Sequence, residues 1–153
     1  MRWIALQACT TEPGPLQLDA ATAQRPIASL SRVQAQLASL ALAFTPRVTV
    51  LDEAVLMDVT ASLRLFGGLQ RLVKLLMQSL ALFFQSNNIS AQSKYAYGAT
   101  SLIALGKLRL PMPMPMPSRA GELPMHALSA ARPHLDVLER TGCRTWNDLL
   151  ELP

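Results

Sequence analysis

Two amphipathic helices are predicted by the spacing of apolar residues along the chain. After Pro26, apolar side chains recur every three or four residues, which places them on one side of a helix that Pro46 ends. The same spacing returns after Gly67-Gly68 and predicts a second helix. The apolar positions are Leu30, Val33, Leu37, Leu40 and Phe44, and then Leu69, Leu72, Val73, Leu76, Leu80 and Phe83.

Four strands and a shorter helix complete the first part of the chain. The strands are expected at 1–8, 48–51, 54–60 and 89–97, and the helix at 99–108. The order strand, helix, strand, strand, helix, strand is that of the ferredoxin-like βαββαβ arrangement, in which two helices pack on one face of an antiparallel sheet. We therefore expect an α+β fold, although unrelated proteins share this arrangement and it does not identify a function.

The rest of the chain divides into a linker and a small helical unit. We assign 1–110 to the sheet domain, 111–122 to a linker and 123–153 to the helical unit. Alternating Pro and Met residues hold the start of the linker near polyproline II, and a ligand for a proline-recognition domain is the alternative interpretation. In the helical unit, Thr145 is a predicted N-cap, with Asp148 three residues later in an approximate capping box.

Composition excludes several classes of protein. Half of the 153 residues are hydrophobic and 16% are charged, so the chain is not disordered. Its net charge of +4 is compatible with nucleic-acid binding. Two distant cysteines, Cys9 and Cys143, indicate a reducing, cytoplasmic location. The longest apolar stretch, 69–84, is interrupted by polar residues, so we expect no membrane segment.

The candidate chemistry lies at Asp52 and Glu53, between the second and third expected strands. These residues either form a tight hairpin or lie in a continuous bent strand. Adjacent carboxylates at a strand junction are suited to Mg²⁺, which prefers oxygen ligands. Two acidic residues in a turn are more commonly only solvated.

The stretch from Leu51 to Thr60 resembles the Asp-Glu motif of Y-family translesion DNA polymerases of the UmuC/DinB type, whose usual form is Ser-x-Asp-Glu-Ala-x-Leu-Asp-Val-Thr. Its continuation to Gly68 is most similar to the catalytically inactive ImuB-like subunits of bacterial mutagenesis cassettes. Asp58 also matches a family position, where we expect it to face solvent or to cap the next turn. The resemblance implies a ferredoxin-like palm-type domain, followed by a thumb-like unit that is incomplete in a short or truncated form.

The family's catalytic residues are only partly present. Active members supply further metal-binding acids from the first strand, but no Asp or Glu occurs here before Glu12, and the equivalent positions are Leu6 and Ala8. Two-metal catalysis needs acids from separate strands. We therefore expect no catalytic residues, with Asp52 and Glu53 as a relict site that binds metal weakly if at all. No cofactor is required, and Mg²⁺ is relevant only if the relict site still binds it.

Two other regions bear on the resemblance. Thr100 and Ser101 stand where an Asn-Lys pair of the family approaches the incoming nucleotide, so a triphosphate contact is lost, and the fingers subdomain is absent. The segment 135–152 resembles the helix-hairpin-helix of the Y-family thumb, whose glycine turn offers backbone N–H groups to a DNA phosphate. The expected DNA-binding residues are Thr141, Gly142, Cys143 and Arg144. An ordinary corner between two helices is the alternative.

The resemblance implies a non-catalytic accessory protein of DNA repair and translesion synthesis in the SOS response to DNA damage. Its expected partners are DNA, bound weakly and without sequence preference, an error-prone replicative-type polymerase, a recombinase-like accessory protein and the sliding clamp. One alternative is an active error-prone Y-family polymerase, which would be a DNA-directed DNA polymerase. A second is a ferredoxin-like binding module unrelated to polymerases.

Overall fold

A four-stranded antiparallel sheet lies at the centre of the protein, with the strand order β2-β3-β1-β4. The structure is a computed structural model that describes residues 1–10, 25–89, 91–111, 117 and 119–152. The strands are β1 (Trp3–Thr10), β2 (Val48–Val50), β3 (Val55–Asp58) and β4 (Ala91–Gly98). The predicted α+β class is confirmed.

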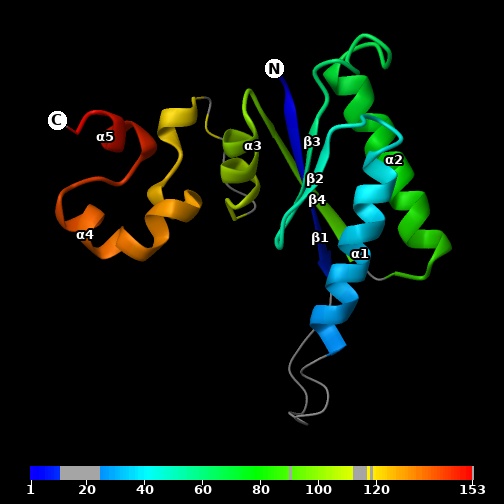
Figure 1. Cartoon of the computed structure of the whole chain (residues 1–153), viewed down its shortest axis with the longest axis horizontal. Helices are drawn as coiled ribbons and strands as arrows, with labels where there is room; N and C mark the ends of the chain where they lie inside the picture. Colours follow the sequence, from blue (N-terminus) through cyan, green and yellow to red (C-terminus); the bar gives the residue numbers. More distant parts are fainter. Residues whose placement is uncertain (11–24, 90, 112–116, 118, 153) are drawn as a thin grey trace.

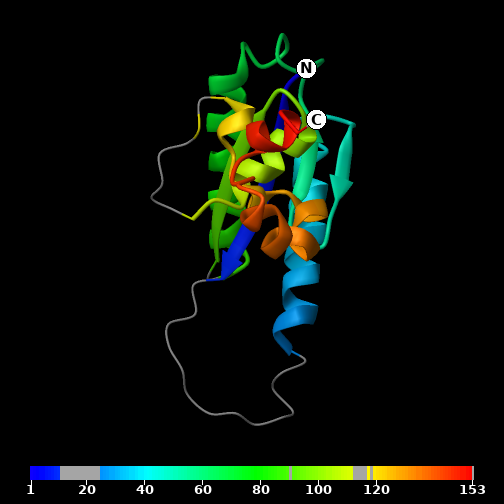
Figure 2. The same ribbon diagram turned by 90° about the vertical axis from the view of Figure 1, so that its left-hand side faces the viewer.

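Helices cover both faces of this sheet (Figure 1). Two long helices, α1 (Arg25–Ala41) and α2 (Leu69–Ser86), pack on one face, and α3 (Ser101–Leu108) packs on the other. Beyond α3 lies a C-terminal unit that contains α4 (Leu135–Arg140) and α5 (Trp146–Leu150). Viewed from the side of this unit, the sheet runs behind α3 with the β2–β3 hairpin toward one side (Figure 2).

The main core lies between the sheet and the two long helices. Because side chains alternate along a strand, Ile4 and Leu6 of β1 face the same side as Val55 and Met57 of β3. The predicted apolar positions from Val33 to Phe83 lie in this core, with Phe44 just beyond the end of α1. Among them, the fully or nearly fully buried ones are Val33, Leu37, Phe44, Leu72, Val73, Leu76 and Leu80. Leu30 lies outside the residues whose side chains are described.

A second, smaller core joins α3 to the opposite face of the sheet. It contains Ala5 and Leu56 from the strands and Ala104 and Leu108 from α3. The chain can turn from β4 into α3 only by a close approach. A Cβ on Gly98 would lie 2.7 Å from the backbone nitrogen of Ala104, so glycine is needed there.

The C-terminal unit is built around Trp146. Three 3₁₀ helices precede α4, namely η1 (Ala120–Glu122), η2 (Met125–Ala127) and η3 (Ser129–His134). The indole nitrogen of Trp146 donates to the backbone oxygen of Pro124 at 3.2 Å, and its ring packs against α3. Thr145 caps α5 with Asp148 in a capping box, as predicted.

Several boundaries differ from those expected. The first helix ends at Ala41 rather than at Pro46, because the chain turns so that Phe44 packs on Phe66, with ring centroids 5.3 Å apart. β3 ends at Asp58 rather than at residue 60, because the Asp58 carboxylate accepts a hydrogen bond from the Thr60 N–H and holds the chain in a turn. Helix η1 lies within the expected linker, 111–122.

Residues 112–116 and 118 of the expected linker, and residues 11–24 before α1, lie outside the described residues. Among the residues that are described, no helix is both long enough and apolar enough to cross a lipid bilayer.

Candidate functional site

The two candidate acids lie at the tip of the β2–β3 hairpin. Asp52 and Glu53 form its two-residue turn, which a hydrogen bond of 2.8 Å from the Leu51 N–H to the Ala54 carbonyl closes. The side chain of Gln34 in α1 donates to the Leu51 carbonyl at 2.5 Å. The tight hairpin is therefore the correct alternative, and it is anchored to a helix.

Glu53 is paired with an arginine that follows α3. The Arg109 guanidinium donates from Nε to both carboxylate oxygens, at 3.2 and 3.1 Å, and from a terminal nitrogen to one of them. The same guanidinium donates to the Ala127 carbonyl and to the Ser129 hydroxyl, each at 2.5 Å. Arg109 thus joins the hairpin to the C-terminal unit.

This contact governs the protonation of Glu53. Hydrogen bonds from Arg109 hold the pKa of the carboxyl below its usual value, partial burial opposes that effect, and the positive charges of Arg109 and Arg132 reinforce it. The side chain of Arg109 is only 8% exposed, whereas that of Glu53 is 36% exposed. A carboxylate whose two oxygens both accept hydrogen bonds from an arginine is not free to coordinate a cation.

Strand β1 supplies no acid opposite the hairpin. Leu6 pairs with Val55 and faces the main core, and Ala8 packs against the same core. The neighbouring positions on the other face are Ala5 and Gln7. Within the described part of the chain, no group of three or more His, Cys, Asp or Glu side chains is arranged to hold a metal ion. The described residues therefore do not form a two-metal site.

Asp58 is buried and caps a turn. Its carboxylate accepts from the backbone N–H of Thr60 at 3.0 Å, from the Thr60 hydroxyl at 2.6 Å and from Arg47 at 3.2 Å. Burial opposes ionisation, but these hydrogen bonds outweigh it and lower the pKa of Asp58. Of the two expectations, capping is confirmed and exposure to solvent is wrong, since Asp58 is 4% exposed.

Thr100 and Ser101, which stand where the family has its nucleotide-contacting Asn-Lys pair, lie at the start of α3. The Thr100 hydroxyl accepts from the backbone N–H of Ile103 at 3.2 Å and caps the helix. Ser101 is the first residue of α3. These two positions carry no positive charge, and Thr100 is occupied by a local structural contact.

The expected DNA-binding residues form the turn between α4 and α5. Gly142 has a φ of +87°, a conformation that glycine adopts without strain, and no atom lies within 4 Å of the position of an added Cβ. Cys143 is buried, whereas Thr141, Gly142 and Arg144 are exposed. Glycine is therefore favoured here by the backbone conformation of the turn and not by the close approach of another atom.

The backbone N–H groups of this turn have partners within the protein. Those of Thr141, Gly142 and Cys143 donate to carbonyls of α4 at 2.8–3.1 Å, and that of Arg144 donates to the Asp148 carboxylate at 2.9 Å. A phosphate at this turn would have to replace those bonds or be held by side chains. The geometry therefore favours side-chain contacts over the expected backbone contacts.

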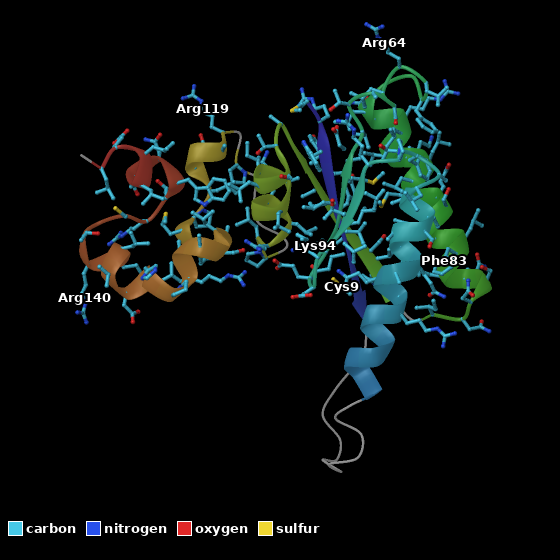
Figure 3. All side chains as sticks on the ribbon, in the orientation of Figure 1. Cys9, Arg64, Phe83, Lys94, Arg119 and Arg140 are labelled. Carbon is cyan, nitrogen blue, oxygen red and sulfur yellow. The ribbon has the colours of Figure 1, made fainter. Side chains whose placement is uncertain are left out.

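Charged side chains of both signs surround an open pocket beside the turn. The pocket has a volume of about 660 Å³, and Arg140 and Arg144 line it together with Asp136 and Glu139. In Figure 3, Arg140 extends outward from the C-terminal unit. The two arginines can attract a phosphate, but the two acids beside them reduce that attraction.

The central role of Arg109 was missed by sequence reasoning. Arginine at a helix end is common, and nothing in the local pattern shows which carboxylate it meets 56 residues away. The only available signal was its position directly after the helix predicted at 99–108.

Comparisons with protein-family profiles, with curated proteins and with solved structures found no match.

Proposed function

We propose that the protein is a non-catalytic accessory factor in DNA-damage tolerance, similar to a Y-family polymerase that has lost its metal site. The observation that carries this proposal is the state of the β2–β3 hairpin. The Asp-Glu pair of the family motif is present at the turn, but Glu53 is engaged by Arg109 and β1 offers no acid opposite it. Only Asp52 remains as an exposed carboxylate at the tip.

A ferredoxin-like palm and a helix-hairpin-helix thumb are part of the same proposal. The element order β1-α1-β2-β3-α2-β4 and the strand order β2-β3-β1-β4 support the palm-like assignment. The glycine turn between α4 and α5 supports the thumb-like assignment, although the two helices have only six and five residues. An error-prone replicative-type polymerase, a recombinase-like protein and the sliding clamp remain the proposed partners.

Primer extension tests the loss of catalysis. The purified chain is incubated with a primed template, Mg²⁺ and all four deoxynucleotides, and we expect no extension. Asp52→Asn is the appropriate companion variant, because the Asp52 side chain makes no hydrogen bond or ion pair with any described residue. Template-dependent extension that disappears in Asp52→Asn would show an active polymerase.

A genetic test addresses the accessory role. In the host, deletion of the gene should lower damage-induced mutagenesis, and Asp52→Asn should leave that mutagenesis intact, because the role needs no metal ligand. Loss of mutagenesis in Asp52→Asn, with the protein still folded, would favour catalysis. Unchanged mutagenesis in the deletion strain would remove the proposed role in damage tolerance.

A further inference from the structure

Strand β4 is an edge of the sheet, with no strand of the described residues along its outer side. It is eight residues long and pairs with β1 over its whole length. An edge strand presents unpaired backbone N–H and C=O groups at alternate residues. Edges of this kind are commonly protected by a charged side chain such as lysine, by a proline, by a bulge or by a short length; β4 contains Lys94 but no proline.

The two faces of β4 differ in chemistry. Tyr95 and Tyr97 lie on the face of α2 and remain 38% and 47% exposed. Lys94 lies on the face of α3, where its Nζ donates to the Leu110 carbonyl at 2.5 Å. Figure 3 shows Lys94 on the side of the sheet that faces α3.

An apolar groove runs between this edge and α2. It has a volume of about 300 Å³, and its lining includes Leu69, Val73 and Met77 of α2 together with the two tyrosines. Lys74 lines it as well. A strand added beside β4 would place every second side chain in this groove and the remaining side chains beside Lys94.

The charge around the edge has one sign. The two elements that form the edge and its groove, α2 and β4, contain three basic residues, Arg71, Lys74 and Lys94, and no Asp or Glu. The carbonyl that Lys94 contacts carries no charge to neutralise it. This region therefore complements a negatively charged partner.

A second copy of the chain fits this edge poorly. Antiparallel pairing of two β4 strands would bring two Lys94 side chains, and two basic α2 helices, toward each other with no acid between them. Nucleic acid would use the positive charge but not the apolar groove or the backbone edge. An extended peptide with acidic and apolar residues in alternation uses all three features.

We propose that the outer edge of β4 binds an extended peptide segment, which adds to the sheet as a fifth strand with its apolar side chains in the α2 groove and its carboxylates beside Lys94. Backbone hydrogen bonds along β4 hold the segment, and the alternation of its side chains sets the specificity. This inference does not depend on the proposed role in DNA-damage tolerance.

The test measures binding of a fluorescent, end-blocked heptapeptide of alternating Glu and Val by fluorescence anisotropy. We expect saturable binding that is lost when alternate backbone nitrogens of the peptide are methylated, because methylation removes the donors that pair with β4. A peptide of alternating Lys and Val should not bind. Lys94→Glu should weaken binding about tenfold through charge repulsion.

Arg64→Glu is the matched control, since it makes the same change in charge in the loop after β3, where Arg64 extends away from Lys94 (Figure 3). It should bind the peptide as the wild type does. Replacing Tyr95 and Tyr97 together by Thr should also weaken binding, and circular dichroism shows whether that variant is folded.

Four results would overturn the proposal. They are the absence of saturable binding, equal binding of the methylated or the lysine peptide, displacement of the peptide by oligodeoxythymidine, and equal weakening by Arg64→Glu and Lys94→Glu. Light scattering completes the test, because a dimer that dissociates in the double tyrosine variant would assign the edge to a second copy of the chain instead.

Discussion

Glu53 and Arg109 form an ion pair that connects the tip of the β2–β3 hairpin to the C-terminal unit. The pair spans 56 residues of sequence, and the same guanidinium also donates to Ala127 and Ser129. A residue that the family motif would use for metal binding is thereby used to hold two parts of the chain together. The adjacent Asp52 has no such contact with a described residue.

Replacing Glu53 should destabilise the protein, whereas replacing its neighbour should not. We expect Glu53→Gln to lower the free energy of unfolding by about 1 kcal/mol, a value reduced for the partial exposure of the carboxylate. Asp52→Asn should change it by less than about 0.5 kcal/mol. Urea denaturation measures both. If the two acids only repelled each other in a relict site, both variants would be neutral or slightly stabilising.

The contribution of Glu53 should disappear in acid. Its pKa is lowered in the folded state, so the stabilisation is fully present above the unfolded value of about 4.3 and is lost as the pH falls through the folded value. The difference in unfolding free energy between wild type and Glu53→Gln should thus be constant from pH 7 to about pH 5 and shrink below that. A difference that grows in acid would contradict the Arg109 contact.

Sequence patterns predicted the elements well because helix and strand periodicities depend on local burial. The stripe of α2 and the capping box at Thr145 are both set by residues within a few positions of each other. The local sequence does not decide between a hairpin and a bent strand at Asp52 and Glu53, because two polar residues between strands fit both. The Gln34 contact that anchors it comes from another element.

The partners of the candidate site residues could not be predicted in the same way. The Arg109 contact depends on where α3 ends relative to the hairpin, which only the packed sheet determines. The internal hydrogen bond from Arg144 to Asp148 uses a backbone N–H that the glycine turn was expected to offer to phosphate. Which face of the sheet the tyrosines of β4 occupy depends on the register of β4 with β1, which the local sequence does not give.

Asp58 should be important for folding, although it lies within the stretch that resembles the family motif. Its carboxylate holds the turn at Thr60, so Asp58→Ala should cost about 2 kcal/mol of unfolding free energy by removing the acceptor of both the N–H and the hydroxyl of Thr60. Asp58→Asn keeps an oxygen that can accept from Thr60, and it should cost about half as much. Equal losses in both variants would show that the charge on Asp58, through Arg47, matters more than the turn.

The contact between α3 and the C-terminal unit should depend on the absence of a side chain at Gly106. A Cβ there would lie 2.9 Å from two ring carbons of Trp146. We expect Gly106→Ala to destabilise the protein by about 1–2 kcal/mol, despite the better helix propensity of alanine. In a Trp146→Leu background the same change should be neutral or stabilising. A double-mutant cycle by chemical denaturation measures the coupling, and additive effects would exclude the steric explanation.

DNA binding, if it follows the proposed function, should depend on arginine side chains at the turn between α4 and α5. The backbone N–H groups of that turn are engaged, and Asp136 and Glu139 lie in the same pocket as Arg140 and Arg144. Binding to a duplex oligonucleotide should therefore be weak, with a dissociation constant of roughly 10⁻⁴–10⁻⁶ M, and independent of sequence. Arg144→Gln should reduce the slope of log K against log salt by about 0.9, the value of one phosphate contact.

The choice of control decides whether such a result locates the interface. Arg144→Glu and Arg64→Glu change the net charge equally, but Arg64 lies in the loop after β3, at the other side of the sheet from the C-terminal unit (Figure 3). A local interface predicts a clear loss of affinity for the first variant and little for the second. Gly142→Ala is unsuitable as a binding variant, because the positive φ of this residue would strain any side chain. Equal losses from the two charge reversals would mean that DNA responds only to net charge and that the turn is not the contact site.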